Sequence, residues 1–275
     1  MEIKEFATKA ELFRYLKENK DYLIAQKKFE MKRADAVSFQ ACVVHDKEEV
    51  TTEKSVETPE TLLTKDVIKV RSIINTTNLL DGHGDCHING LWKKSLKEQK
   101  NMLLLREHKI TFDYIISDNV EASTKKMTWK ELGFDFEGET EALIFDSEIA
   151  KSRNPYMFEM YARGYVKSHS VGMSYVKMFL CINSEEKYYM AEKADWDKYI
   201  GDVANRAEAE EKGYFWAVTE AKLIEGSAVP MGSNWATPTQ SVKEYIEPSE
   251  DTRIDTEPPE GTQKVLFINF LNKIQ

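Results

Sequence analysis

The chain has 275 residues, with 47 acidic against 38 basic side chains and a formal net charge of −9. This excess of acid argues against a nucleic-acid partner, because such binding depends on neutralising phosphates. Three cysteines without a spacing pattern fit a reducing compartment rather than a disulfide framework. No apolar run approaches the roughly 18 residues of a membrane span, and the N-terminus lacks a signal-peptide core. We therefore expect an intracellular protein with no membrane partner.

Local patterns predict the elements in chain order. A helix is expected over residues 8–30, where Thr8 and Glu11 have the spacing of a capping box. The charged, Thr- and Glu-rich residues 46–61 then predict a flexible connection. Beyond it, runs rich in β-branched side chains predict strands near 67–74, 102–105, 142–145, 165–178 and 214–225. Helical patterns between these strands lie near 91–100, 154–164 and 191–212.

Few of these strands alternate with helices, which argues against a doubly wound sheet. The expected fold is α+β, with a mixed or antiparallel β-barrel core flanked by helices. We expect an N-terminal helical segment with its connection (1–60), a main domain (61–245) and an acidic, proline-containing tail (246–275). Composition predicts disorder for residues 246–262, and the apolar run 264–271 could be a docking helix or a bound peptide.

A strand near the middle of the chain carries the strongest chemical signal. Read as a strand, it places Ser168, Ser170, Gly172 and Ser174 on one face. Serine and glycine side chains are too small to fill a hydrophobic core. They leave a shallow surface on which a serine nucleophile can reach a peptide substrate. The glycine would let a substrate backbone approach closely. His169 points to the opposite face, so the base for such a serine must come from elsewhere.

A serine nucleophile needs a base, and the base needs a third group that holds its tautomer. His108 is the best placed histidine, because it follows the apolar run 102–105 where a strand leaves the core. A surface histidine at a strand exit is the alternative, and His83 is the second candidate for the base. Glu225 is the one carboxylate on a mostly apolar strand face, where an imidazolium partner would offset the cost of burial. Alternatively, the strand ends earlier and this side chain reaches water.

Four segments carry motifs in a definite order. Asp81–Trp92 has two aspartates in a turn before a Gly-aromatic helix start, and Leu103–His108 is a strand that ends in a histidine. Gly164–Met173 contains Ser-Val-Gly, and Leu223–Asn234 contains Glu-x-Ser-x-Val-Pro. Together they resemble the tailed-bacteriophage prohead maturation proteases, a serine peptidase family. The fold of that family is similar to assemblin, the herpesvirus capsid protease. The resemblance covers about residues 65–240.

The resemblance implies a serine endopeptidase with Ser170 as nucleophile, His108 as base and Glu225 as the group that orients the base. It implies cleavage of scaffold and capsid-protein segments, and of the enzyme's own ends. The place would be the host cytoplasm, inside the assembling prohead. The implied partners are the phage scaffold and major capsid protein, with self-association as a further expectation, and no cofactor is expected.

An oxyanion hole is also required, because the attacked carbonyl oxygen becomes negative. We expect it to use main-chain N–H groups of Gly232, Ser233 and Asn234 in the turn after the last strand. Arg153 or Arg163 could supply the positive charge instead.

Two other interpretations remain open. The turn Asp81–His87 holds carboxylates, imidazoles and a thiol that can bind a metal, which would give a metal-binding hydrolase. Its two glycines disfavour the helix that would bring both imidazoles to one face, so a polar turn is the commoner explanation. A catalytically silent capsid-assembly or scaffold-like protein on the same fold would have the same composition. Such a silent protein would be unaffected by Ser170→Ala, whereas the serine peptidase would lose its activity.

Overall fold

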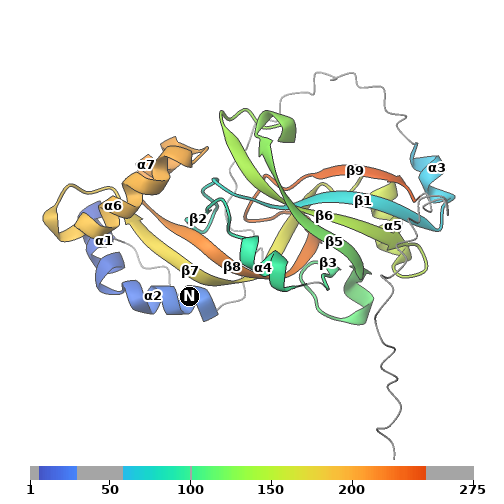
Figure 1. Cartoon of the computed structure of the whole chain (residues 1–275), viewed down its shortest axis with the longest axis horizontal. Helices are drawn as coiled ribbons and strands as arrows, with labels where there is room; N and C mark the ends of the chain where they lie inside the picture. Colours follow the sequence, from blue (N-terminus) through green and yellow to red (C-terminus); the bar gives the residue numbers. More distant parts are fainter. Residues whose placement is uncertain (1–5, 30–57, 100, 246–275) are drawn as a thin grey trace, which may run out of the picture. The chain divides into compact units, whose positions relative to one another are not determined.

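The fold is described by a computed structural model that covers residues 6–29, 58–99 and 101–245. Its strands lie in two sheets, flanked by helices (Figure 1). The strands are β1 (Val67–Thr76), β2 (Asp85–His87), β3 (Leu104–Arg106), β4 (Ile115–Ser117), β5 (Asn119–Thr128), β6 (Glu139–Ala150), β7 (Ser168–Ile182), β8 (Tyr214–Val229) and β9 (Thr239–Glu244). The α+β class expected from the sequence is therefore confirmed.

One sheet has the order β5-β6-β1-β9 and is antiparallel throughout. The other is built on the long antiparallel pair of β7 and β8. Two short strands, β2 and β3, run parallel to β8, and β4 lies beside β3. The sheets pack closely at Gly226, where an added Cβ would come within 2.6 Å of the Phe145 ring and 3.2 Å of the Ile74 side chain.

The expected closed barrel is wrong for the described part of the chain. A barrel requires every edge strand to be hydrogen-bonded to a neighbour. No ladder of hydrogen bonds joins the two sheets within the described residues. Next to β9, β7 forms a single isolated bridge, between Ser168 and Pro238. Beyond this bridge β7 is an edge strand, so the second sheet stays open along that side.

The helices are α1 (Lys9–Glu18), α2 (Lys20–Phe29), α3 (Pro59–Leu63), α4 (Lys93–Glu98), α5 (Pro155–Ala162), α6 (Met190–Tyr199) and α7 (Arg206–Lys212). The single helix expected over 8–30 is thus two helices that meet at Asn19. Its predicted start is confirmed, since Thr8 Oγ1 accepts the N–H of Glu11 at 3.2 Å. The long helix expected over 191–212 is likewise divided into α6 and α7.

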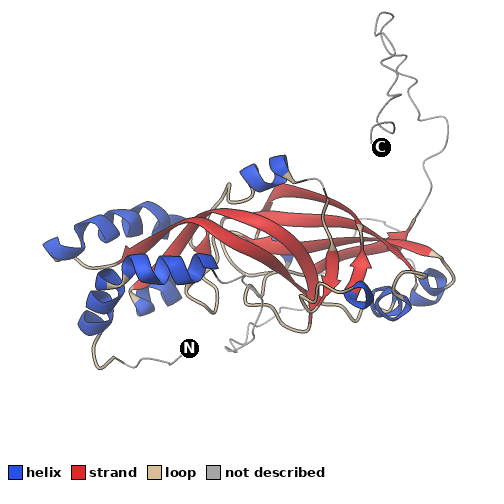
Figure 2. Cartoon of the chain, turned by 90° about the horizontal axis from the view of Figure 1, so that it is seen from below, coloured by secondary structure: helices blue, strands red, loops and turns tan. Residues whose placement is uncertain are grey.

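Four helices, α1, α2, α6 and α7, lie around the end of the β7–β8 pair at which β7 ends and β8 begins, as Figures 1 and 2 show. Phe13 and Leu16 of α1 belong to the main hydrophobic core. The ring of Phe13 meets Tyr189 edge to face, with centroids 6.2 Å apart. The N-terminal helices are therefore packed on the domain that follows them.

Several expectations fall outside the described residues. These are most of the connection over 46–61 and both parts of the tail, 246–262 and 264–271. Among the helices that are described, none combines the length and apolar character needed to cross a membrane.

Candidate active site

A histidine and a glutamate meet inside the second sheet. His108 follows β3, and Glu225 lies on β8, to which β3 is paired. The Nδ1 atom of His108 is 2.5 Å from Oε1 of Glu225, and the two residues are 5 % and 2 % exposed. The alternatives of a surface histidine and a solvated glutamate are therefore wrong.

The turn that carries His108 has an unusual backbone. Glu107 and His108 both have positive φ, at 55° and 56°, a region that residues other than glycine rarely adopt. Such residues cost of the order of 1–3 kcal/mol each and persist where the surroundings hold them. Here the N–H of Glu107 donates to Ala228 O at 3.0 Å, and that of His108 donates to Ser227 Oγ at 3.1 Å. The strained turn therefore aims the imidazole at Glu225.

Ser227 connects both members of this pair. Its hydroxyl donates to Oε2 of Glu225 at 2.6 Å while its oxygen accepts the His108 N–H. It is fully buried. Ser227 is the serine of the Glu-x-Ser-x-Val-Pro motif, which by itself assigns it no role. Strand alternation could have indicated one, since Ser227 lies two positions after Glu225 on the same face.

Ser170 lies on the same face of the sheet as this pair. In the β7–β8 ladder Ser170 is opposite Ser227, and Gly172 is opposite Glu225. Directly opposed residues of antiparallel strands share a face, with Cβ atoms about 5 Å apart. The hydroxyl face expected from the sequence thus faces the side on which His108 meets Glu225. Ser170 itself is 7 % exposed.

Gly172 has a different role from the one expected. A Cβ at this position would lie 2.0 Å from Oε1 of Glu225. The space left by the missing side chain is therefore filled by the glutamate and not held open for a substrate backbone. A small residue is required here so that Glu225 can lie flat across β7.

The second ring nitrogen of His108 is available. Its Nε2 is buried and has no hydrogen-bond partner among the residues that the structure describes. A buried polar atom without a partner is uncommon and calls for an explanation. With Nδ1 held by Glu225, the lone pair of Nε2 is free to accept a proton from a hydroxyl.

No family model, curated protein or solved structure matches the chain. The candidate site therefore rests on the geometry of its own residues.

His169 is a core histidine, as the strand alternation predicts. Its Nε2 is 2.9 Å from the hydroxyl of Tyr161, and its Nδ1 is 3.2 Å from Thr237 O. Burial lowers the pKa of His169 to about 4, although the contact with Thr237 opposes this change. The imidazole is therefore neutral near pH 7. Because both of its ring nitrogens have other partners and it lies on the face opposite Ser170, it is not placed to act as the base for this serine.

The expected oxyanion donors lie in the turn after β8. The backbone N–H groups of Gly232, Ser233 and Asn234 lie outside regular elements, and none of them donates to another described residue. Gly232 packs on the chain before Ser170, since an added Cβ would lie 2.7 Å from His169 O. Asn234 also has a structural task, because its side-chain amide donates to Thr76 O at 2.8 Å.

The two arginines considered as alternatives are paired elsewhere. Arg163 forms a bridge of 2.7 Å with Glu159 one helical turn away, and Arg153 lies 3.6 Å from Asp118. Neither is directed at the candidate site by these contacts.

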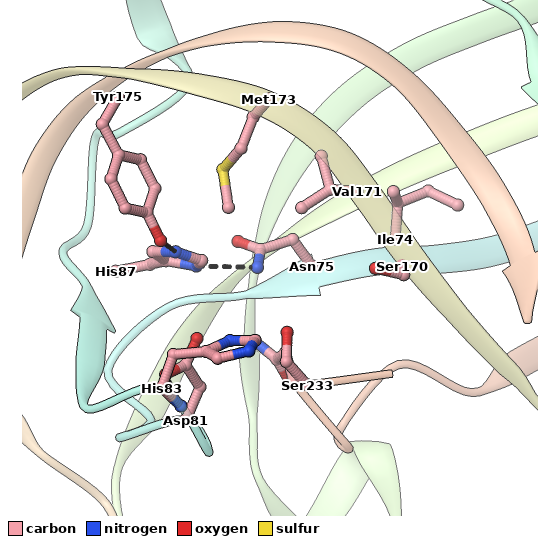
Figure 3. Close-up of a pocket in the computed structure, with 11 residues that line it drawn as sticks. Ile74, Asn75, Asp81, His83, His87, Ser170, Val171, Met173, Tyr175 and Ser233 are labelled. Carbon is pink, nitrogen blue, oxygen red and sulfur yellow. Dashed lines mark hydrogen bonds between the residues drawn. The ribbon is translucent and has the colours of Figure 1, made fainter. Parts of the chain in front are cut away.

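A small cavity of about 10 Å³, enough for one water molecule, adjoins Ser170. Figure 3 shows Ser170 on one side of it, and Ser233 close to Asp81 and His83 of the polar turn on another. His83, the second candidate for the base, is exposed at this cavity.

The metal alternative gains no support from the described residues, among which no group of three or more potential ligand side chains is arranged around a common point. Oδ1 of Asp81 instead accepts the N–H groups of His83 and Asp85 at 2.8 and 2.9 Å, which closes the turn. Burial, together with the charge of Asp85, raises the pKa of Asp81 to about 7.

Proposed function

We propose that the protein is a serine endopeptidase that acts through Ser170, His108 and Glu225. The observation that carries the proposal is the buried contact of 2.5 Å between His108 Nδ1 and Glu225 Oε1, which leaves Nε2 without a partner. A carboxylate in that place fixes the tautomer of the imidazole and stabilises its protonated form.

In this mechanism Nε2 of His108 takes the proton of the Ser170 hydroxyl as its oxygen attacks the carbonyl carbon of the scissile peptide. The tetrahedral intermediate then collapses, the C–N bond breaks, and the imidazolium gives its proton to the leaving amine. Water hydrolyses the resulting ester with the same histidine as base. Ser170 and the imidazole end each cycle in their starting protonation states.

The edge of β7 suits an extended peptide. The N–H of His169 donates to Thr237 O, on the side away from β8. Because alternate residues of an antiparallel ladder point their backbone groups the same way, the N–H and C=O of Val171 also face that side. Neither has a partner there within the described residues. A substrate strand could pair with these groups beside Ser170.

The N–H groups of Gly232, Ser233 and Asn234 are our candidates for the oxyanion hole. They have no other hydrogen-bond acceptor among the described residues, and Ser233 and Asn234 adjoin the same cavity as Ser170. Preorganised backbone donors stabilise a developing oxyanion without reorganising.

The motif resemblance extends the proposal to a biological setting. By that resemblance the fold is of the assemblin type, and the substrates are the phage scaffold, extensions of the major capsid protein and the enzyme's own ends. The reaction would take place in the host cytoplasm within the assembling prohead. The competing function is a silent assembly protein that keeps the same residues without turnover.

The test compares wild-type protein with Ser170→Ala, His108→Ala and Glu225→Gln, each co-expressed with the neighbouring capsid proteins. Mass spectrometry of the fragments is the measurement. We expect Ser170→Ala to abolish cleavage, a loss of at least about 10³-fold. Glu225→Gln should cost less than His108→Ala, because the amide still holds the ring in place. Ser174→Ala, on the same strand face, is the matched control. Undiminished cleavage by Ser170→Ala would exclude the mechanism.

A further inference from the structure

The strained turn that carries His108 is contacted at both of its ends by one tyrosine. Arg106 precedes the two residues with positive φ, and Lys109 follows them. The N–H of Lys109 donates to Arg106 O at 3.2 Å, so the chain reverses between these two cations. Both lie against the same ring, since Arg106 Cζ is 4.1 Å and Lys109 Nζ 4.5 Å from the ring centroid of Tyr114.

The guanidinium of Arg106 is held mainly by aromatic rings. Its Nε is buried and has no hydrogen-bond partner among the described residues, where no acidic side chain forms an ion pair with it either. A second ring, that of Tyr156 at the start of α5, lies with its centroid 5.7 Å from Cζ. A cation over an aromatic face is attracted by the ring quadrupole, and more strongly where water is excluded. The placement of Arg106 therefore depends on these two tyrosines.

The hydroxyl of Tyr114 takes part as well. Its oxygen lies 3.4 Å from Nζ of Lys109. Hydrogen bonding from Arg106, and then from Lys109, lowers the pKa of Tyr114, as expected for a phenol that two cations approach. The ring and the hydroxyl thus favour the same placement of the two cationic side chains.

Tyr114 is itself held in place. It directly precedes β4, whose first residue, Ile115, is paired with Leu105 of β3. The side-chain amide of Asn154, the N-cap of α5, donates to Ile115 O at 3.2 Å and to Asp113 O at 3.4 Å. The backbone on both sides of Tyr114 is therefore tied to a buried residue, and the ring offers a fixed surface to the turn.

We propose that Tyr114 is a positioning residue that holds the turn of Glu107 and His108 in the conformation in which the imidazole meets Glu225. Residues with positive φ persist only where their surroundings hold them. Tyr114 supplies part of that hold through the side chains at the two ends of the turn. The consequence for catalysis rests on the proposed peptidase function, whereas the consequence for the turn does not.

The conformation of the turn can be measured without any activity. The N–H of His108 donates to Ser227 Oγ at 3.1 Å, so its exchange with solvent, followed by NMR of the full chain, reports opening of the turn. Tyr114→Leu removes both ring contacts and should speed this exchange about tenfold, the equivalent of two exposed cation–π contacts. Tyr114→Phe keeps the ring and should stay within about threefold of wild type.

In an active enzyme the same variants separate kcat from KM. Tyr114→Leu should lower kcat about tenfold, because fewer molecules hold the base in place. KM should stay near that of wild type, because the contacts of Tyr114 described above do not involve β7, and Tyr114→Phe should recover most of kcat. Tyr188→Leu is the matched control. It removes a comparable contact, with Lys17 Nζ 4.6 Å from the ring centroid, and should leave both constants unchanged.

A milder variant keeps the test decisive where Tyr114→Leu does not fold. Lys109 is exposed, so Lys109→Ala should fold, and the loss of one of the two cations should speed exchange at His108 about threefold. Glu107→Gln removes only the exposed ion pair of 3.0 Å between Glu107 and Lys109. Its exchange should match that of wild type, because both ring contacts remain.

Wild-type exchange at His108 in a folded Tyr114→Leu would overturn the proposal, as would equal effects of Glu107→Gln and Lys109→Ala. In an active enzyme, a raised KM with unchanged kcat for Tyr114→Leu would overturn it too. If wild-type protein cleaves no peptide, the peptidase function fails, and the exchange measurement alone decides the role of Tyr114.

Discussion

Ser227 is the residue that joins the backbone of His108 to the carboxylate of Glu225. We expect Ser227→Ala to lower kcat by about 10- to 100-fold, the value of a hydrogen bond to a charged group. KM should stay near that of wild type, because Ser227 is fully buried and does not line the cavity. Steady-state kinetics measures both constants, with Ser174→Ala as the control. A change in KM alone would contradict a role in holding the base.

Gly172 makes room for Glu225, so Gly172→Ala should harm both stability and activity. The added Cβ would lie 2.0 Å from Glu225 Oε1, and the carboxylate must move. Such overpacking costs about 1–3 kcal/mol of unfolding free energy, which urea denaturation can measure. Gly201→Ala is the control, because nothing lies within 4 Å of its new Cβ. Equal stability for the two variants would refute this account.

At this scale the alternation of strands predicts much of the candidate site. It separates Ser170 from His169 and singles out Glu225 before any contact is known. It does not predict the turn at His108, because no residue type there signals a positive φ. The sequence also does not predict that Glu225 fills the space at Gly172, because this depends on which residue of the neighbouring strand lies opposite the glycine.

Among the elements, the attachment of α1 and α2 to α6 depends on one buried acid. Burial alone would raise the pKa of Glu192, but hydrogen bonds from Lys17 and Lys20 outweigh it and lower the pKa below its ordinary value of 4.5. A lowered pKa means that the stabilisation is complete above pH 4.5 and is lost as the pH falls through the folded-state value.

We therefore expect the amides of residues 9–29 to exchange faster as the pH falls below 4.5, beyond the intrinsic pH dependence of exchange. Glu192→Gln should show fast exchange at every pH, because it cannot pair with either lysine as a charge. Glu210→Gln removes an exposed partner of Arg206 and serves as the control. Slow exchange of 9–29 in Glu192→Gln would show that packing alone holds the helices.

The long strands are predictable as elements because their β-branched runs are long. The three-residue β2 is not, since Asp85 and His87 indicate a polar turn until Lys27 and Tyr175 are known to satisfy them. The exposed edge strand β5 has no apolar run of its own to signal it. The break at Asn19 escapes prediction because the apolar stripe continues across it.

For the molecule as a whole, His169 links global stability to pH. Its imidazole is buried with a pKa of about 4, whereas the unfolded chain has a value near 6.5. Between these values only the unfolded state binds the proton, so stability falls as the pH is lowered from 6.5 to 4. The difference corresponds to about 3 kcal/mol of unfolding free energy.

Urea denaturation at pH 7 and pH 4.5 measures this loss. His169→Gln should have a flatter pH profile, because the amide cannot take up the proton. Tyr161→Phe keeps the imidazole and should retain most of the slope. A wild-type profile that matches that of His169→Gln would show that other groups govern acid unfolding.

The attachment of α1 and α2 to the rest of the chain has a consequence for processing. A cut anywhere in residues 30–57 would divide the chain without detaching its first part, since Phe13, Leu16 and Lys27 are anchored in the remainder. The product would behave as a two-chain protein. It would elute as one species under native conditions and separate into two bands only in denaturant. Cleavage in this segment would therefore break the polypeptide without changing the size of the folded protein.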